Sequence, residues 1–269
     1  MPSLSSPKAD LLLEVKQLEV VYHRVATAIQ GISIEVPDAS IVAIIGTNGA
    51  GKTTTLRAIS GFLPAEDVRI TDGTILYRGT RVEGNTPYKL SKNGMVLVPE
   101  RDKVFDTLTV QDNLLFNVSA KRQRIVEQVY SYFPKLAGRR SQLAGYLSGG
   151  EKQMLAIGMA LVCEPHLLMI DELSLGLAPI MTQSLMRTLQ QMNRDMSLTM
   201  LIVEQNALAA LTIASFAYIM EGGRIVYKGA TADLLSHQDV RDFYLGGSDK
   251  TLKSYRDVKQ YRRKRRWWG

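Results

Sequence analysis

The pattern of apolar and polar residues predicts alternating strands and helices over most of the chain. The two residue classes alternate over 11–21 and again over 32–36, as in strands with one buried face. Residues 40–46, SIVAIIG, form a continuous β-branched run that predicts a strand buried on both faces. The later pattern predicts helix 150–163, strand 167–171, helix 178–194, strand 198–203 and helix 206–213. Such alternation implies a parallel sheet.

Two regions depart from this alternation. Residues 63–95 carry glycines and prolines between short strand-like pieces, which predicts an irregular, β-rich arm. Residues 105–146 carry a helical pattern, which predicts a helical subdomain. The expected architecture is therefore α/β, with two additions to a parallel core.

A glycine-rich segment lies directly between the predicted buried strand and a helix-like pattern. It consists of Gly46, Thr47, Asn48, Gly49, Ala50, Gly51, Lys52 and Thr53, which fit G-x-x-x-x-G-K-[ST], and Thr54 follows. In such a loop, backbone N–H groups surround phosphate oxygens, the lysine adds a positive charge at the β and γ phosphates, and the threonine hydroxyl can bind Mg²⁺. The order strand, glycine loop, helix favours a nucleotide site over a simple glycine-rich turn.

Two acids end the apolar strand predicted over 167–171. The segment reads LLMIDE, so Asp171 and Glu172 stand at its carboxyl end. Strand-end acids alone are most simply explained as solvated side chains. With a nucleotide loop upstream, Asp171 is predicted to serve Mg²⁺ and Glu172 to polarise the attacking water.

Residues 147–153 read LSGGEKQ. Ser148, Gly149 and Gly150 can be interpreted as a helix N-cap, the simplest role for this pattern. Between a phosphate loop and a two-acid strand, however, the heptad resembles the signature of the ATP-binding cassette (ABC) ATPases, over most of 12–246. The resemblance implies a P-loop NTPase fold: a RecA-like parallel sheet core, an antiparallel β arm and a helical signature subdomain.

The resemblance also implies how ATP is bound and hydrolysed to ADP and phosphate. Two cassettes, as a homodimer or a heterodimer, enclose the nucleotide, and the signature residues 148–150 of one contact the γ-phosphate held by the loop 46–54 of the other. Tyr22 matches the aromatic residue that stacks on adenine, although it can equally be an ordinary strand tyrosine. Residues 174–177 match the loop that connects the two active sites.

Three departures from the family pattern bear on which subfamily the chain resembles. Leu173 replaces a usual proline, Glu100 stands where a glutamine usually senses Mg²⁺ and the membrane partner, and Gln205 replaces the switch histidine. With VEQNA at 203–207 and FYLGG at 243–247, the chain is similar to the second ATPase of branched-chain amino-acid and amide or urea importers. Glu100 can act as a metal ligand, and Gln205 can donate a neutral hydrogen bond to phosphate.

That resemblance implies transmembrane permease subunits as partners and, indirectly, a periplasmic solute-binding protein. It implies a peripheral location on the cytoplasmic face of the inner membrane. Two alternatives stay open: an exporter cassette, against which Gln205 argues, and a non-transport ABC ATPase acting on nucleic acid or ribosomes, which only the basic C-terminus suggests.

Charge and cysteine content refine these expectations. Of the net charge of +7 on 269 residues, all resides in 249–269, so the rest of the chain is neutral and a whole-domain nucleic-acid surface is not supported. We expect an ATPase domain over 10–247, with its helical subdomain at about 105–160, and a basic tail over 248–269. Near its end the tail carries Trp267 and Trp268 beside basic residues, which favours contact with an anionic membrane surface or with an acidic patch of a partner over a merely solubilising role. The single Cys163 fits a reducing compartment and a buried, inert thiol.

Overall fold

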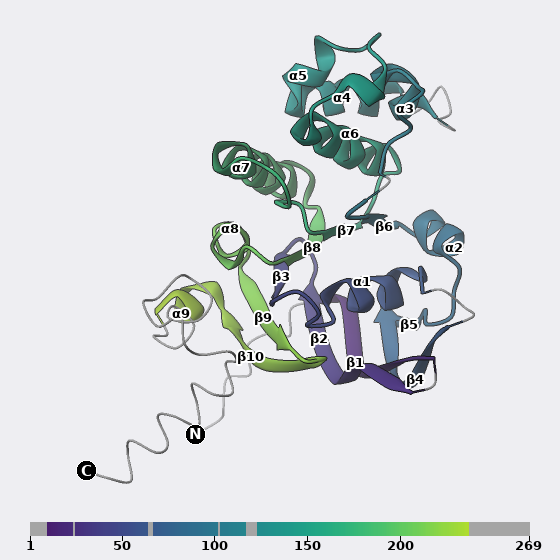
Figure 1. Ribbon diagram of the computed structural model, residues 1–269, viewed down its shortest axis with the longest axis vertical. Helices are drawn as coiled ribbons and strands as arrows, with labels where there is room; N and C mark the ends of the chain where they lie inside the picture. Colours follow the sequence, from purple (N-terminus) through teal and green to yellow (C-terminus); the bar gives the residue numbers. More distant parts are fainter. Residues whose placement is uncertain (1–9, 24, 64–66, 102, 117–122, 237–269) are drawn as a thin grey trace.

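The computed structural model describes residues 10–23, 25–63, 67–101, 103–116 and 123–236 (Figure 1). The strands are β1 Leu11–Tyr22, β2 Ala26–Pro37, β3 Ile41–Ile45, β4 Val68–Tyr77, β5 Thr80–Arg81, β6 Met95–Val98, β7 Leu167–Asp171, β8 Thr199–Glu204, β9 Phe216–Glu221 and β10 Arg224–Ala230. The helices are α1 Lys52–Ser60, α2 Pro87–Lys92, α3 Val110–Leu115, α4 Gln123–Tyr132, α5 Pro134–Ala137, the 3₁₀ turn Ala144–Tyr146, α6 Gly149–Val162, α7 Pro179–Met196, α8 Ala207–Leu211 and α9 Thr231–Ser236.

Six strands form the core sheet, in the order β10-β9-β3-β8-β7-β6. Strands β9, β3, β8, β7 and β6 are parallel, which confirms the predicted parallel sheet, whereas β10 pairs antiparallel with β9 at the edge. A two-residue turn, Gly222-Gly223 with φ of 52° and 76°, connects β9 to β10. The carboxyl ends of β3, β7 and β8 therefore lie side by side, where ligands bind in open α/β sheets.

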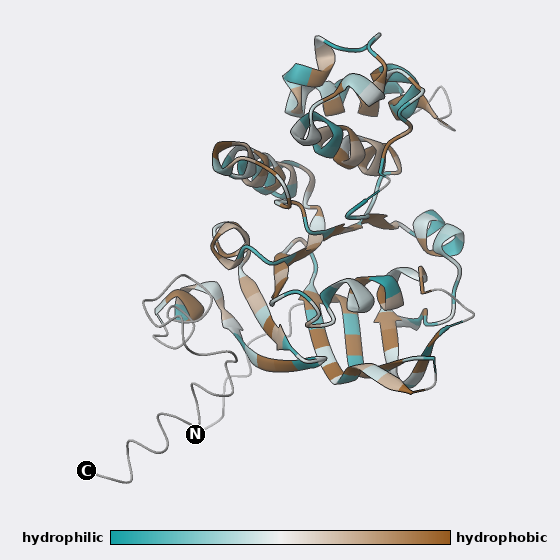
Figure 2. Cartoon of the chain, viewed as in Figure 1, coloured by the Kyte–Doolittle hydropathy of each residue, from teal (hydrophilic) through white to brown (hydrophobic). Residues whose placement is uncertain are grey.

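The two faces of the core sheet carry two separate hydrophobic clusters. Side chains of a strand alternate between faces. Val42 and Ile44 of β3 therefore pack with helix α1 and the arm, whereas Ile41, Ala43 and Ile45 pack with the helices on the other face. All five residues of β3 are buried, as predicted from the unbroken apolar run. The strands of the arm differ from β3 in this respect, because hydrophobic and hydrophilic residues alternate along them (Figure 2).

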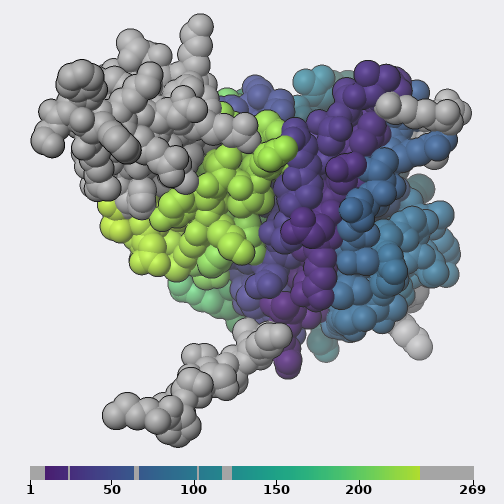
Figure 3. All heavy atoms as spheres, turned by 90° about the horizontal axis from the view of Figure 1, so that it is seen from below, coloured from purple at the N-terminus to yellow at the C-terminus, as the bar shows by residue number. Residues whose placement is uncertain are grey.

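The arm is a four-stranded antiparallel sheet in the order β2-β1-β4-β5. From below, β1 and β2 form a continuous surface between β10 on one side and β4 and β5 on the other (Figure 3). The prediction of an irregular β arm over 63–95 was partly wrong, because this segment also contains helix α2. Thr86 caps α2 by accepting a hydrogen bond from the Lys89 backbone N–H, and Pro87 provides its first residue. This pair is a helix-start signal in the sequence.

Helices α3, α4, α5 and α6 pack together above the core sheet, in the region where the sequence predicts a helical subdomain (Figure 1). Within the described ranges, every helix is too short or too polar to span a bilayer. The segment 243–247 and the basic tail lie outside the described residues, so the domain boundary at 247 and the membrane contact of the tail stay predictions. Cys163, expected to be buried, is half-buried at the end of α6.

Candidate functional site

The glycine-rich segment forms the connection between β3 and α1. Gly49 and Gly51 have φ of 78° and 103°, a left-handed conformation that favours glycine. A β-carbon on Gly46 would collide with the carbonyl oxygen of Met220 in β9. Glycine at these three positions therefore allows the backbone to follow this path. The segment ends at the N-terminus of α1, where backbone N–H groups and the helix dipole favour an anion.

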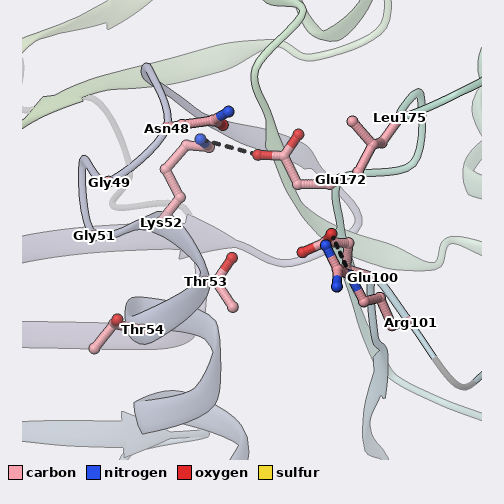
Figure 4. A pocket seen from close by; sticks show the side chains of 10 residues that line it. All are labelled: Asn48, Gly49, Gly51, Lys52, Thr53, Thr54, Glu100, Arg101, Glu172 and Leu175. Carbon is pink, nitrogen blue, oxygen red and sulfur yellow. Dashed lines mark hydrogen bonds and ion pairs between the residues drawn. The ribbon is translucent and has the colours of Figure 1, made fainter.

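Lys52 and Glu172 form a buried ion pair across the site. The Nζ atom of Lys52 lies 2.9 Å from Oε1 of Glu172, and the two side chains are 4% and 8% exposed (Figure 4). Nζ also donates a hydrogen bond of 3.1 Å to the carbonyl oxygen of Thr47. An ammonium group carries three donors. Lys52 can therefore hold both partners and still donate to a phosphate oxygen.

Thr53 and Asp171, two of the three residues predicted to bind Mg²⁺, also meet in the structure. The Thr53 hydroxyl donates a hydrogen bond of 3.0 Å to Oδ1 of Asp171. Burial raises the pKa of Asp171 to about 6, although the hydrogen bond from Thr53 partly opposes this shift. One hydroxyl and one carboxylate fit Mg²⁺ in a nucleotide site, because that ion usually keeps several waters and takes further oxygens from the phosphates.

The glycine-rich loop and Glu172 line a cleft of about 440 Å³ (Figure 4). Its walls include Lys52, Thr53 and Glu172, and also Glu100 on the segment after β6. Glu100 accepts a hydrogen bond of 3.1 Å from Nε of Arg101, which partly offsets its negative charge. The volume lies in the range of small-molecule sites.

Tyr22 is the last residue of β1 and contacts the start of α1. Its hydroxyl lies 3.2 Å from the hydroxyl of Thr54, and the ring is half-buried. The structure thus brings the predicted adenine-stacking residue against the first turn of α1. Its role in binding adenine stays a prediction.

Ser148, Gly149 and Gly150 start helix α6 and are not among the residues that line the cleft. Ser148 forms a capping box with Glu151, so the N-cap interpretation is correct as a description of local structure. Ser148 and Gly149 are nevertheless exposed. One chain therefore does not bring the signature residues to its own glycine-rich loop.

The segment after β7 is attached to the end of β8. Gln205 lies just beyond β8, and its backbone N–H donates a hydrogen bond of 3.3 Å to Oε2 of Glu172, while its side chain is exposed. Leu173, which replaces the usual proline, is 1% exposed and packs in the cluster beneath the helices. A buried leucine thus anchors the start of this loop.

The sequence analysis missed two polar groups beside the site. Glu204, at the end of β8, is fully buried, and its carboxylate accepts hydrogen bonds from the backbone N–H and the hydroxyl of Ser174. Lys103 donates a hydrogen bond to the side chain of Gln153 in α6, and burial lowers the pKa of Lys103. The signal that drew attention to Asp171, an apolar strand ending in an acid, was equally present for Glu204.

The buried carboxyl of Glu204 gives a prediction for pH dependence. Burial raises its pKa to about 7, well above that of the unfolded chain. The folded state therefore binds the extra proton between about pH 4.5 and 7, and its stability falls as pH rises through this range. Glu204→Gln lacks this titration, so its free energy of unfolding should not show this fall. The difference in the free energy of unfolding, variant minus wild type, should therefore rise by roughly 3 kcal/mol from pH 4.5 to 7. Urea unfolding of both proteins from pH 4.5 to 8 measures this difference, and a constant difference would contradict the raised pKa.

The fold and the cleft define an ATP-binding cassette. The family model for ABC transporter matches residues 29–174. The chain belongs to this family, as one of its ATP-hydrolysing cassettes. It is 42% identical over 230 residues to the high-affinity branched-chain amino acid transport ATP-binding protein BraG of Pseudomonas aeruginosa, covering 84% of this chain and 96% of that protein. The probable branched-chain amino acid transport ATP-binding protein LivF of Archaeoglobus fulgidus is 32% identical, with 80% and 91% covered.

Solved structures support the same fold. The ADP conformation of MJ1267, an ATP-binding cassette of an ABC transporter, superposes with a TM-score of 0.77 at 24% identity, covering 88% of this chain and 99% of that one. The dimeric structure of the bacterial ABC transporter cassette MJ0796 gives a TM-score of 0.71 at 18% identity, with 81% and 98% covered. The family and fold predicted from the sequence are thus confirmed.

Proposed function

We propose that this chain energises the uptake of branched-chain amino acids through a membrane permease. The observation that carries the proposal is the 42% identity to a branched-chain amino acid transport ATP-binding protein over nearly the whole of that relative. In this proposal the chain is peripheral at the cytoplasmic face of the inner membrane, contacts transmembrane permease subunits, and receives solute indirectly from a periplasmic binding protein. Uptake of related amides or urea is the nearest alternative.

In the proposed mechanism, the loop 46–54 binds the ATP phosphates through its backbone N–H groups and Lys52, and Tyr22 stacks on adenine. Mg²⁺, when bound, would neutralise charge on the β and γ phosphates, and Thr53, Asp171 and Glu100 would hold it. The buried position of Asp171 beside the Thr53 hydroxyl supports this assignment. Gln205 would donate a neutral hydrogen bond to the γ-phosphate.

Glu172 is the proposed general base. When Lys52 donates its third hydrogen bond to the γ-phosphate, the negative charge of that phosphate weakens the ion pair with Oε1 of Glu172, which can then accept a proton from water. The water oxygen then attacks the γ-phosphorus, the bond between that phosphorus and the ADP oxygen breaks, and Glu172 retains the proton. The hydrogen bond from the Gln205 backbone keeps Oε2 in place during this change.

A second cassette completes the proposed site. The exposed Ser148 and Gly149 support this arrangement, because they are not among the residues that line the cleft of their own chain. In a dimer, residues 148–150 of one chain would contact the γ-phosphate bound by the partner chain. A homodimer and a pair with a related cassette are both compatible with this geometry.

A deletion strain of the native host tests the proposed function. Without this gene, uptake of labelled leucine, isoleucine and valine should fall several-fold, and a plasmid copy should restore it. The Glu172→Gln variant, expressed at the same level, is the matched control and should not restore uptake. Loss of labelled urea or amide uptake alone would favour the nearest alternative. Unchanged uptake of every solute would contradict an importer role. The exporter and the non-transport ATPase would then be tested, the latter by looking for RNA that copurifies with the protein.

A further inference from the structure

The loop that follows Glu172 is joined to the end of β8 at three successive residues. The backbone N–H of Glu172 donates a hydrogen bond of 2.9 Å to the carbonyl oxygen of Val203. The Ser174 backbone N–H and hydroxyl donate bonds of 2.9 Å and 2.6 Å to the two carboxylate oxygens of Glu204. The Gln205 backbone N–H reaches back to the Glu172 carboxylate at 3.3 Å.

This attachment holds a backbone conformation that is unfavourable in isolation. Glu172 has a φ of 50°, in the left-handed region, which costs an ordinary residue free energy. Such conformations persist where neighbouring contacts determine them, and they cluster at functional sites. In this chain the contacts just beyond Glu172 include the burial of Leu173 and the two hydrogen bonds between Ser174 and Glu204.

In its ionised form, the Glu204 side chain can accept both hydrogen bonds that Ser174 donates. Its two oxygens only accept hydrogen bonds, so each can take one bond from Ser174. A glutamine side chain offers one accepting oxygen, and its NH₂ group could meet the Ser174 hydroxyl only if that hydroxyl turned round to accept. Burying a carboxylate is costly unless hydrogen bonds compensate it, and Glu204 is 0% exposed. The residue therefore fits a requirement for two fixed acceptors at this point.

We propose that Glu204 is a positioning residue for ATP hydrolysis, which holds Ser174 and thereby fixes the left-handed backbone of Glu172 and the direction of its carboxylate. The proposal rests on the proposed role of Glu172 as general base. Glu204 itself does not contact the nucleotide. Its effect is transmitted over one residue of backbone, from Ser174 to Glu172.

Four purified variants test the proposal: Glu204→Gln, Ser174→Ala, their combination, and Thr199→Val as a control. Thr199 is also buried in β8, but it hydrogen-bonds to Asp38 and Ala39 at the far end of the strand. We expect Glu204→Gln to lower the ATPase kcat by about 10- to 100-fold, because small displacements of a catalytic group have effects of this size. Binding of a non-hydrolysable ATP analogue should change by less than about threefold, and Thr199→Val should leave kcat unchanged.

The kcat values of combined variants distinguish a positioning role from a general loss of stability. The combined variant should be about as slow as Glu204→Gln alone, since Ser174→Ala removes only the hydroxyl part of the contact that Glu204→Gln already disrupts. In a Glu172→Gln background, Glu204→Gln should cause no further loss of kcat. A Glu204→Gln protein with normal kcat, or losses that multiply in either combination, would overturn the proposal. If Glu172→Gln alone leaves the rate unchanged, the general-base role fails instead. Ser174→Ala, on a half-buried loop, keeps the test usable if Glu204→Gln does not fold.

Discussion

Glu172→Gln is expected to slow ATP hydrolysis by about 100-fold or more while leaving nucleotide affinity at or above that of wild type. A positioned general base contributes on this order to the rate, and an amide cannot accept the proton of the attacking water. Affinity is retained because the substitution removes a negative charge that lies 2.9 Å from the Lys52 ammonium. The measurements are steady-state ATPase rates and equilibrium binding of ATP.

Glu164→Gln is a suitable control for this prediction. Glu164 also follows a buried apolar segment and also has a positive φ, of 55°, but it lies in the connection between α6 and β7, outside the residues that form the cleft. Its substitution should leave the rate within about twofold of wild type. An unchanged rate in Glu172→Gln would remove Glu172 from the mechanism.

Lys52→Ala is expected to weaken ATP binding by about 10- to 100-fold, since hydrogen bonds to charged groups contribute roughly 1.5–3 kcal/mol. It should also lower the free energy of unfolding, by on the order of 3 kcal/mol, because it leaves Glu172 buried without its ion-pair partner. Isothermal titration with ATP and urea unfolding measure the two effects separately.

The double variant Lys52→Ala, Glu172→Gln separates the loss of stability, which comes from the unpaired Glu172, from the loss of ATP affinity, which comes from the missing phosphate contact. It should recover much of the lost stability, because the buried charge is gone, but none of the lost affinity. Lys16→Ala, at a lysine that is 51% exposed and paired with Glu14 on the arm, is the control and should change neither quantity. Normal ATP affinity in Lys52→Ala would contradict the proposed phosphate contact.

The local elements and the nucleotide loop could be predicted because their signals are short-range. The predicted strand 167–171 agrees with β7, and the unbroken run before Gly46 predicted a strand buried on both faces. Helix α2 was missed although Thr86 and Pro87 start it. Its six residues are too few to show a helical period within a segment rich in glycine and proline.

The sequence alone singled out the residues that are proposed to bear the chemistry: the glycine loop with Lys52, the acids at the end of β7, and the signature at the start of α6. It could not show their partners, because those partners are far apart along the chain. Lys52 and Glu172 are paired only because β3 and β7 flank β8 in one parallel sheet, which places their carboxyl ends together. The same juxtaposition gives Glu204 its bonds to Ser174. Strand order is set by how both faces of the sheet are covered, so the tertiary structure decided these contacts.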